Sequence, residues 1–138
     1  MRLSKRRENS VAEIKQTLRI IQSMYKRDDS IRILQCDGYI NFETYDYAKE
    51  ILARLFKGGI YKIIFDLTDI KYVSSSGWAL FLGPLETARS MGGDIKLASM
   101  PDEVKFVFEA LELDNLLEYY DSADTAAEAF MKKTESGE

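Results

Sequence analysis

The apolar residues of the chain follow two periods, one typical of strands and one typical of helices. Residues 31–36 and 60–65 are short runs rich in isoleucine, and they predict two buried β-strands. Between these runs, apolar residues recur at helical spacing from residue 48 to residue 56, which predicts an amphipathic helix. Asn41 is the expected N-cap of this helix, and the glycines that follow Lys57 end it.

The second half of the chain continues the alternation of helices and strands. The pattern predicts a loop at 67–74, a helix at 76–91 that Pro84 kinks or breaks, and a strand at 95–98. Three later elements are a helix opened by Pro101, a short strand at 116–120, and a helix capped by Ser122 that runs through Met131. The buried stripe of the helix after Pro101 is predicted to be Val104, Val107, Phe108 and Leu111.

The N-terminal part of the chain is ambiguous by its pattern. Apolar residues from Val11 to Tyr25 keep helical spacing, and Ser10 with Glu13 matches a capping box. Residues 18–25, however, are rich in β-forming residues and lie one short turn before the strand at 31–36, as in a hairpin. Periodicity does not choose between the helix and the hairpin.

Composition narrows the function by exclusion. The chain has 138 residues, enough for one domain with its own core. It contains no histidine, the commonest general base and a usual zinc ligand, and its single cysteine, Cys36, can form no internal disulfide. We therefore expect a protein that is not an enzyme and has no catalytic residue, metal site or cofactor.

The distribution of charged and apolar residues indicates whether the protein binds nucleic acid or a membrane. Residues 1–10 carry four basic side chains and one acidic one, whereas residues 101–138 carry eleven acidic and three basic ones. The acidic C-terminal stretch argues against nucleic-acid binding, and we expect the basic N-terminus to be a solvated tail. No apolar run is long enough to span a membrane, and no apolar segment follows the basic residues, so we expect a cytoplasmic protein without a membrane partner.

Three serines and a glycine, Ser74 to Gly77, precede the helix predicted at 76–91. Hydroxyls and free backbone N–H groups at a helix N-terminus suit a phosphate, either bound or attached covalently to one serine. A serine at this place is most often only an N-cap, and no glycine-rich nucleotide loop is present. From the residues alone, the structural role is favoured.

The residues around these serines resemble the STAS domain, the family of bacterial anti-sigma factor antagonists. Asp66-Leu-Thr followed by Ser74-Ser-Ser-Gly-Trp78 resembles the family signature Asp-Leu-Ser…Asp-Ser-Ser-Gly-Leu. Residues 37–42 resemble its Gly-x-Leu-Asp turn, and residues 112–122 resemble its Gly-Leu-Asp-x-Leu-Phe…Tyr-Asp-Ser passage. The resemblance covers residues 17–131 in the element order of the family.

The resemblance implies a single α/β domain. The expected STAS-like fold has a mixed, mainly parallel sheet of four to five strands, with about four helices packed on one face. Because the family begins with a hairpin, we expect a strand near 17–25. The expected boundaries are an N-terminal extension at 1–12, the domain at 13–132 and a frayed tail at 133–138.

The resemblance also implies a switch at Ser75. In the family, the serine at this position is phosphorylated by a partner that is both an anti-sigma factor and a serine kinase. The unmodified protein would bind that anti-sigma factor and so free sigma, and the phosphorylated protein would release it until a serine phosphatase acts. We expect a monomer when free, with phosphorylation at Ser75 in preference to Ser76 or Ser74, and a partner-binding surface of Asn41, Ser74, Ser75, Ser76, Gly77 and Trp78.

Two departures from the family pattern leave alternatives open. Ser74 and Asn41 stand where the family carries aspartates, so two carboxylates near the serine are replaced by neutral groups. One alternative is therefore a STAS adaptor without phosphorylation, in a signalling or transporter-associated complex. The other is a phosphate or nucleotide binder that uses residues 74–77.

Overall fold

The computed structural model describes residues 17–135, which build a mixed five-stranded sheet in the order β1-β2-β3-β4-β5. Strands β1 (Leu18–Tyr25) and β2 (Asp28–Ile40) form an antiparallel hairpin, which settles the N-terminal ambiguity as a strand. Strands β3 (Lys62–Val73), β4 (Asp94–Ala98) and β5 (Glu118–Tyr120) then add parallel to β2. The predicted mixed, mainly parallel sheet is confirmed.

The helices connect these strands as the pattern predicted. They are α2 (Phe42–Lys57), α3 (Ala79–Leu82), α4 (Leu85–Ser90), α5 (Asp102–Ala110) and α6 (Ala123–Glu135), with a 3₁₀ turn η1 (Leu113–Asn115). The Asn41 side chain accepts hydrogen bonds from the backbone N–H groups of Glu43 at 3.0 Å and Thr44 at 3.1 Å, which confirms it as the cap of α2. The predicted break at Pro84 separates α3 from α4.

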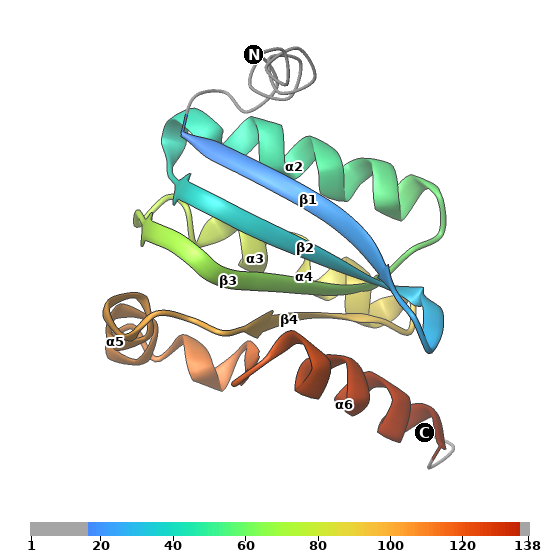
Figure 1. Ribbon diagram of the computed structural model, residues 1–138. Helices are drawn as coiled ribbons and strands as arrows, with labels where there is room; N and C mark the ends of the chain where they lie inside the picture. Colours follow the sequence, from blue (N-terminus) through green and yellow to red (C-terminus); the bar gives the residue numbers. More distant parts are fainter. Residues whose placement is uncertain (1–16, 136–138) are drawn as a thin grey trace, which may run out of the picture.

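The two faces of the sheet carry different helices (Figure 1). The larger core joins the sheet to α2, α3, α4 and α5, whereas a smaller core of Ile31, Ile64 and Ala98 packs against Ala127 and Phe130 of α6. The four helices predicted on one face are α2, α3, α4 and α5, and a fifth helix, α6, covers the other face. Right-handed crossovers that step in one direction across a parallel sheet place their helices on one face, but α6 follows the last strand and is free of that constraint.

Strands β2 and β3 are longer than predicted. β2 continues past Asp37 to Ile40, and β3 continues past Asp66 to Val73, so the loop predicted at 67–74 is mostly strand. The register between the two strands shifts twice along this stretch, at Gln35/Asp37 and at Gly38/Tyr39. Each shift breaks the period of two that marks a strand in a sequence, and for this reason the pattern there resembled a loop.

Helix α5 buries only half of its predicted stripe. Val104 and Phe108 are buried, but Val107 and Leu111 lie on the surface. The chain turns after α5 through Glu112, whose φ is +59°, and the next residue, Leu113, is the one whose side chain is buried in the larger core.

The C-terminal helix is longer than predicted. α6 ends at Glu135 rather than at Met131, so part of the tail expected to fray is helical. The predicted N-terminal extension at 1–12 and the last residues, 136–138, lie outside the described part of the chain.

Candidate functional site

The three serines lie in a turn at the end of the sheet where the C-termini of β2 and β3 lie; we call this end the edge of the sheet. The Ser74 N–H, directly after β3, donates a hydrogen bond of 2.9 Å to the carbonyl oxygen of Ile40, the last residue of β2. The N-cap of α2, Asn41, follows Ile40 directly. The parallel pairing of β2 with β3 therefore brings Asn41 and the serine turn together, although they are far apart in the sequence.

Ser74 holds the turn in shape. Its carbonyl oxygen accepts from the N–H groups of Gly77 at 2.9 Å and Trp78 at 3.2 Å. Its Oγ accepts a second bond of 3.0 Å from Gly77 N–H and lies 3.1 Å from Ser76 Oγ. A hydroxyl at position 74 thus supplies the capping acceptor that an aspartate could supply, without the negative charge.

Ser75 is the available hydroxyl of the three. Its side chain is exposed, and within residues 17–135 no group hydrogen-bonds to its Oγ. Ser76 is also exposed, but its Oγ is engaged with Ser74. The geometry therefore agrees with the preference for Ser75, which stays a prediction as a phosphorylation site.

Gly77 and Trp78 are buried parts of the site. A Cβ on Gly77 would lie 2.4 Å from the Ile40 carbonyl oxygen, so no side chain fits there. Trp78 is 3% exposed, and its ring packs at 5.8 Å from both Phe81 and Phe108. The expected place of Trp78 on the partner-binding surface is wrong, because the aromatic core of α3 and α5 takes up its side chain.

The helix after the serines is shorter than the sequence predicted. Residues 75–78 form turns, and the helix that begins at Ala79 has only four residues before Gly83. A helix dipole is built from aligned peptide units, so four residues provide little of it. The sequence argument that a helix N-terminus attracts phosphate here is therefore not supported.

The sequence analysis missed three exposed aromatic residues at this edge. Phe42 is 84% exposed, Tyr72 is 54% exposed and Tyr39 is 41% exposed. Tyr39 and Tyr72 are direct partners across β2 and β3, and Phe42 follows the N-cap of α2. We call these three residues the aromatic rim. One signal was present, since Phe42 falls outside the helical stripe of Thr44, Ala48, Leu52 and Leu55 that α2 buries.

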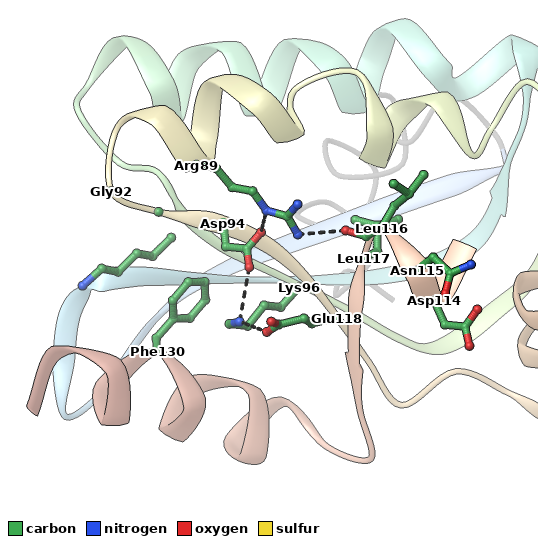
Figure 2. A pocket seen from close by; sticks show the side chains of 12 residues that line it. Arg89, Gly92, Asp94, Lys96, Asp114, Asn115, Leu116, Leu117, Glu118 and Phe130 are labelled. Carbon is green, nitrogen blue, oxygen red and sulfur yellow. Dashed lines mark hydrogen bonds and ion pairs between the residues drawn. The ribbon is translucent and has the colours of Figure 1, made fainter. Parts of the chain in front are cut away.

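A second polar cluster lies near the opposite ends of the strands and lines a cavity of about 780 Å³ (Figure 2). Lys96 is 1% exposed, and its Nζ contacts Asp94 at 3.3 Å, Tyr120 Oη at 3.4 Å and the Glu118 carboxylate. The Arg89 guanidinium bonds Asp94 at 2.8 Å and the Leu116 carbonyl oxygen at 2.8 Å. We call Arg89, Asp94, Lys96, Glu118 and Tyr120 the lysine network.

The lysine network is internally satisfied. Its buried ammonium has three polar partners and lies 4.7 Å from the centre of the Phe130 ring of α6. Burial, together with the hydrogen bond to Glu118, raises the pKa of Tyr120, so its hydroxyl stays protonated. The cluster therefore joins β4, β5 and α6, and it leaves no charged group unpaired for a ligand.

The described residues also give information on the sequence expectations about metal sites, cysteine chemistry and membrane spans. Among the described residues, no three potential metal ligands gather, and no helix is both long and apolar enough to cross a bilayer. Cys36 is fully buried in β2, and its burial raises the pKa of the thiol. The interpretation of Cys36 as a small residue in a strand agrees with this position.

Comparisons with known proteins point to one family. The family model described as the STAS domain matches residues 22–126. A Thermotoga maritima protein named "Putative anti-sigma factor antagonist" is 26% identical over 110 residues, which are 79% of this chain and 97% of that protein.

Solved structures show the same fold. The crystal structure of a Thermotoga maritima protein of the same description has a TM-score of 0.74 at 23% identity and covers 81% of this chain and 94% of its own. The Bacillus anti-sigma factor antagonist SpoIIAA has TM-scores of 0.62 unphosphorylated and 0.61 phosphorylated, both at 17% identity. These two structures cover 82% and 80% of this chain, and in each case 97% of their own.

Proposed function

Because the chain belongs to the STAS domain family, we propose that it is an anti-sigma factor antagonist switched by phosphorylation of Ser75. The observation that carries the proposal is the state of the Ser75 hydroxyl, which is exposed and makes no hydrogen bond to any residue from 17 to 135, on a turn whose other two serines bond to each other. The Thermotoga relative and SpoIIAA bear the name of this function, and SpoIIAA has been solved in a phosphorylated form.

The unmodified protein binds an anti-sigma factor through the serine turn and the aromatic rim. Exposed aromatic side chains are well suited to such a contact, because burying them removes a large apolar area from water with little loss of side-chain freedom. The anti-sigma factor that is held in this way cannot hold its sigma factor, and transcription by that sigma factor proceeds.

The same partner carries the kinase activity in this proposal. Ser75 Oγ attacks the γ-phosphorus of ATP bound to the partner, the Oγ–P bond forms, the bond to ADP breaks, and the hydroxyl proton leaves to a base of the partner. This chain contributes only the hydroxyl and is not itself an enzyme. A separate serine phosphatase restores the hydroxyl by hydrolysis.

Phosphorylation ends binding through local charge. A phosphoserine adds about −1.5 to −2 charges at pH 7. This charge appears on a surface that is buried in the complex, where an unpaired charge is costly. The turn itself needs no rearrangement, since Ser75 takes no part in the hydrogen bonds that shape it. The neutral Ser74 and Asn41 reduce repulsion within the phosphorylated protein, which favours that state.

Mass spectrometry of the intact protein tests the switch. The chain is incubated with Mg-ATP and candidate serine-kinase anti-sigma factors from its own organism, and we expect a gain of one phosphoryl group. Ser75→Ala should gain nothing, whereas the matched variant Ser76→Ala should still be modified. An anti-sigma factor that binds the chain but adds no phosphoryl group would contradict the switch and favour a constitutive adaptor.

Binding measurements test the interface. Ser75→Asp should weaken the complex by about tenfold, a change of roughly 1.4 kcal/mol, whereas Ser75→Ala should bind as the unmodified chain does. Equal affinities of the two variants would count against the proposed mechanism of release.

A further inference from the structure

We propose that residues 1–16 of the chain bind back onto the aromatic rim and compete there with the partner. The contact itself is intramolecular, and only its regulatory role rests on the proposed function. Three observations carry this proposal: the point where the segment joins the fold, the apolar character of the rim, and the charges around it.

The segment joins the fold directly beside the rim. The Thr17 carbonyl oxygen accepts a hydrogen bond of 2.7 Å from the N–H of Tyr39, a rim residue. Gly38 has a φ of +123°, and a Cβ there would lie 2.1 Å from the Thr17 oxygen, so only glycine lets the two backbones approach so closely. The point at which residues 1–16 join the described fold therefore lies at the same end of the sheet as the rim and the serines.

This attachment makes even a weak contact effective. Sixteen residues span roughly 50 Å when extended, so their reach does not limit contact with any part of the edge. A segment tethered through a short linker has an effective concentration in the millimolar range at its site. A contact too weak to form between separate molecules would thus be populated within one molecule.

The rim offers apolar surface, and the segment carries side chains to cover it. Phe42 is the most exposed large apolar residue in the described part of the chain, at 84%, and Tyr39 and Tyr72 pair at the same end of the sheet. Tyr39 and Tyr72 lie on the sheet face away from the core under α2, whereas Phe42 begins α2, so the three side chains surround the end of the sheet and together offer apolar surface to a segment that crosses it. Residues 1–16 contain Leu3, Val11 and Ile14, which can pack on these rings.

The charges of the segment and the rim are complementary. Residues 1–16 carry five basic and two acidic side chains. Around the rim, Asp37 and Asp69 stand directly opposite each other across β2 and β3, and two exposed acids follow Phe42 on α2, Glu43 and Asp46. The basic groups in this region are Arg19, which is 3.5 Å from Asp37, and Lys71.

A cation near Asp37 and Asp69 would reduce the repulsion between the two carboxylates. Like charges at directly opposed positions of a sheet repel each other. Within residues 17–135, the ion pair recorded for these two aspartates is the one between the exposed Arg19 and Asp37. The basic side chains at positions 2, 5, 6 and 7 can supply the missing charge. The sequence alone favoured a solvated tail because the place where the segment joins the fold was not visible in it.

Paramagnetic relaxation measured by NMR tests the contact without any partner. Cys36 is fully buried, so Ser4→Cys creates a single reactive site for a nitroxide label. The label should broaden the amide signals of Phe42 and Tyr72 strongly, and those of Gly59 and Gly92 little, because these glycines precede β3 and β4 at the far edge.

A charge-reversed chain gives the relaxation enhancement that the covalent attachment of the segment alone produces, which serves as the baseline. It carries the same label, with Arg2, Lys5, Arg6 and Arg7 all changed to Glu. We expect the relaxation enhancement at Phe42 and Tyr72 to be several-fold larger in the native segment than in this baseline, and Phe42→Ser should lower the enhancement at Tyr72 to the baseline. Equal enhancement in the native and charge-reversed chains would overturn the proposal.

A mixture of labelled unenriched chain and unlabelled ¹⁵N-enriched chain identifies the occupant. Broadening in this mixture as strong as in the singly labelled chain would mean that the segment of a second copy covers the rim, which would overturn the intramolecular contact. Its absence supports that contact.

Binding to the anti-sigma factor tests whether residues 1–16 compete with this partner for the rim. The charge-reversed chain should bind this partner several-fold more tightly than the native chain, because the rim is no longer covered. Unchanged affinity would overturn the competition. If no anti-sigma factor binds either chain, the proposed function fails, while the nitroxide result still decides the contact.

Discussion

The serine turn, at the C-terminal ends of β2 and β3, and the lysine network, on β4 and β5, are two polar regions of one sheet that differ in what surrounds them. The network contains a lysine that is 1% exposed, and its charged groups are paired with one another. The turn carries no charge on its three serines, yet the exposed Ser75 hydroxyl has no hydrogen-bond partner among the described residues. The region richer in ionisable groups is therefore structural, and the simpler one is available for chemistry.

Burial explains the difference. A buried charge is tolerated only when it is paired and hydrogen-bonded, so each group of the network is already engaged with its neighbours. A hydroxyl on an exposed turn has no such requirement, because water satisfies it until an enzyme of another chain arrives. We therefore expect changes in the network to affect folding, and changes at the turn and the rim to affect partners.

The largest effect on folding is expected for Lys96→Met. The change removes the ammonium from a site that holds Asp94, Glu118 and Tyr120, and it should lower the free energy of unfolding by about 3 kcal/mol, as breaking a buried pair does. Urea unfolding followed by circular dichroism measures this loss. The matched control, Lys71→Met on the exposed part of β3, should change stability little. A loss for Lys96→Met no greater than that of the control would break the comparison.

An intermediate effect is expected for Gly77→Ala. The new Cβ would lie 2.4 Å from the Ile40 oxygen, and the shift that relieves this overlap should cost about 2 kcal/mol of unfolding free energy. Since the shift moves the serine turn, phosphorylation of Ser75 should also slow. The control is Gly58→Ala, whose Cβ would meet its nearest atoms at 3.6 Å. A native-like melting temperature for Gly77→Ala would show that the turn is not held against β2 as described.

The smallest effects on folding are expected at the aromatic rim. Phe42→Ser should change the unfolding free energy by less than about 0.5 kcal/mol, because an exposed side chain loses few contacts. It should nevertheless weaken anti-sigma factor binding by about tenfold, as truncating an interface aromatic does. Phe106, which is 73% exposed on α5, provides the control: Phe106→Ser should leave this affinity unchanged. Equal losses of affinity for both variants would remove the special role of the rim.

Much of the architecture was predictable because its signals are local. Asn41 caps α2, Pro84 separates α3 from α4, and Ser122 caps α6 through a bond of 3.0 Å from Thr125 N–H. Each of these features depends on residues within a few positions of one another.

The wrong predictions share a different cause. The extension of β3 to Val73 depends on a shifted register with β2, and the burial of Trp78 depends on Phe108, thirty positions later. Neither relation leaves a period in the sequence. The same holds for Lys96, since a lysine at an apolar strand position shows its partners Glu118 and Tyr120 only once β5 lies beside β4.

The sequence by itself determined the order of helices and strands, the caps and breaks that bound them, and the serines that carry the family signature. These features follow from side-chain periodicity and backbone preferences, which act over a few residues. Only the tertiary structure decided which serine is left unbonded, which aromatic residues stay exposed around it, and that residues 1–16 join the fold at the same edge. Those outcomes depend on strand pairing and packing between distant segments, whose physical effect exists only after the chain has folded.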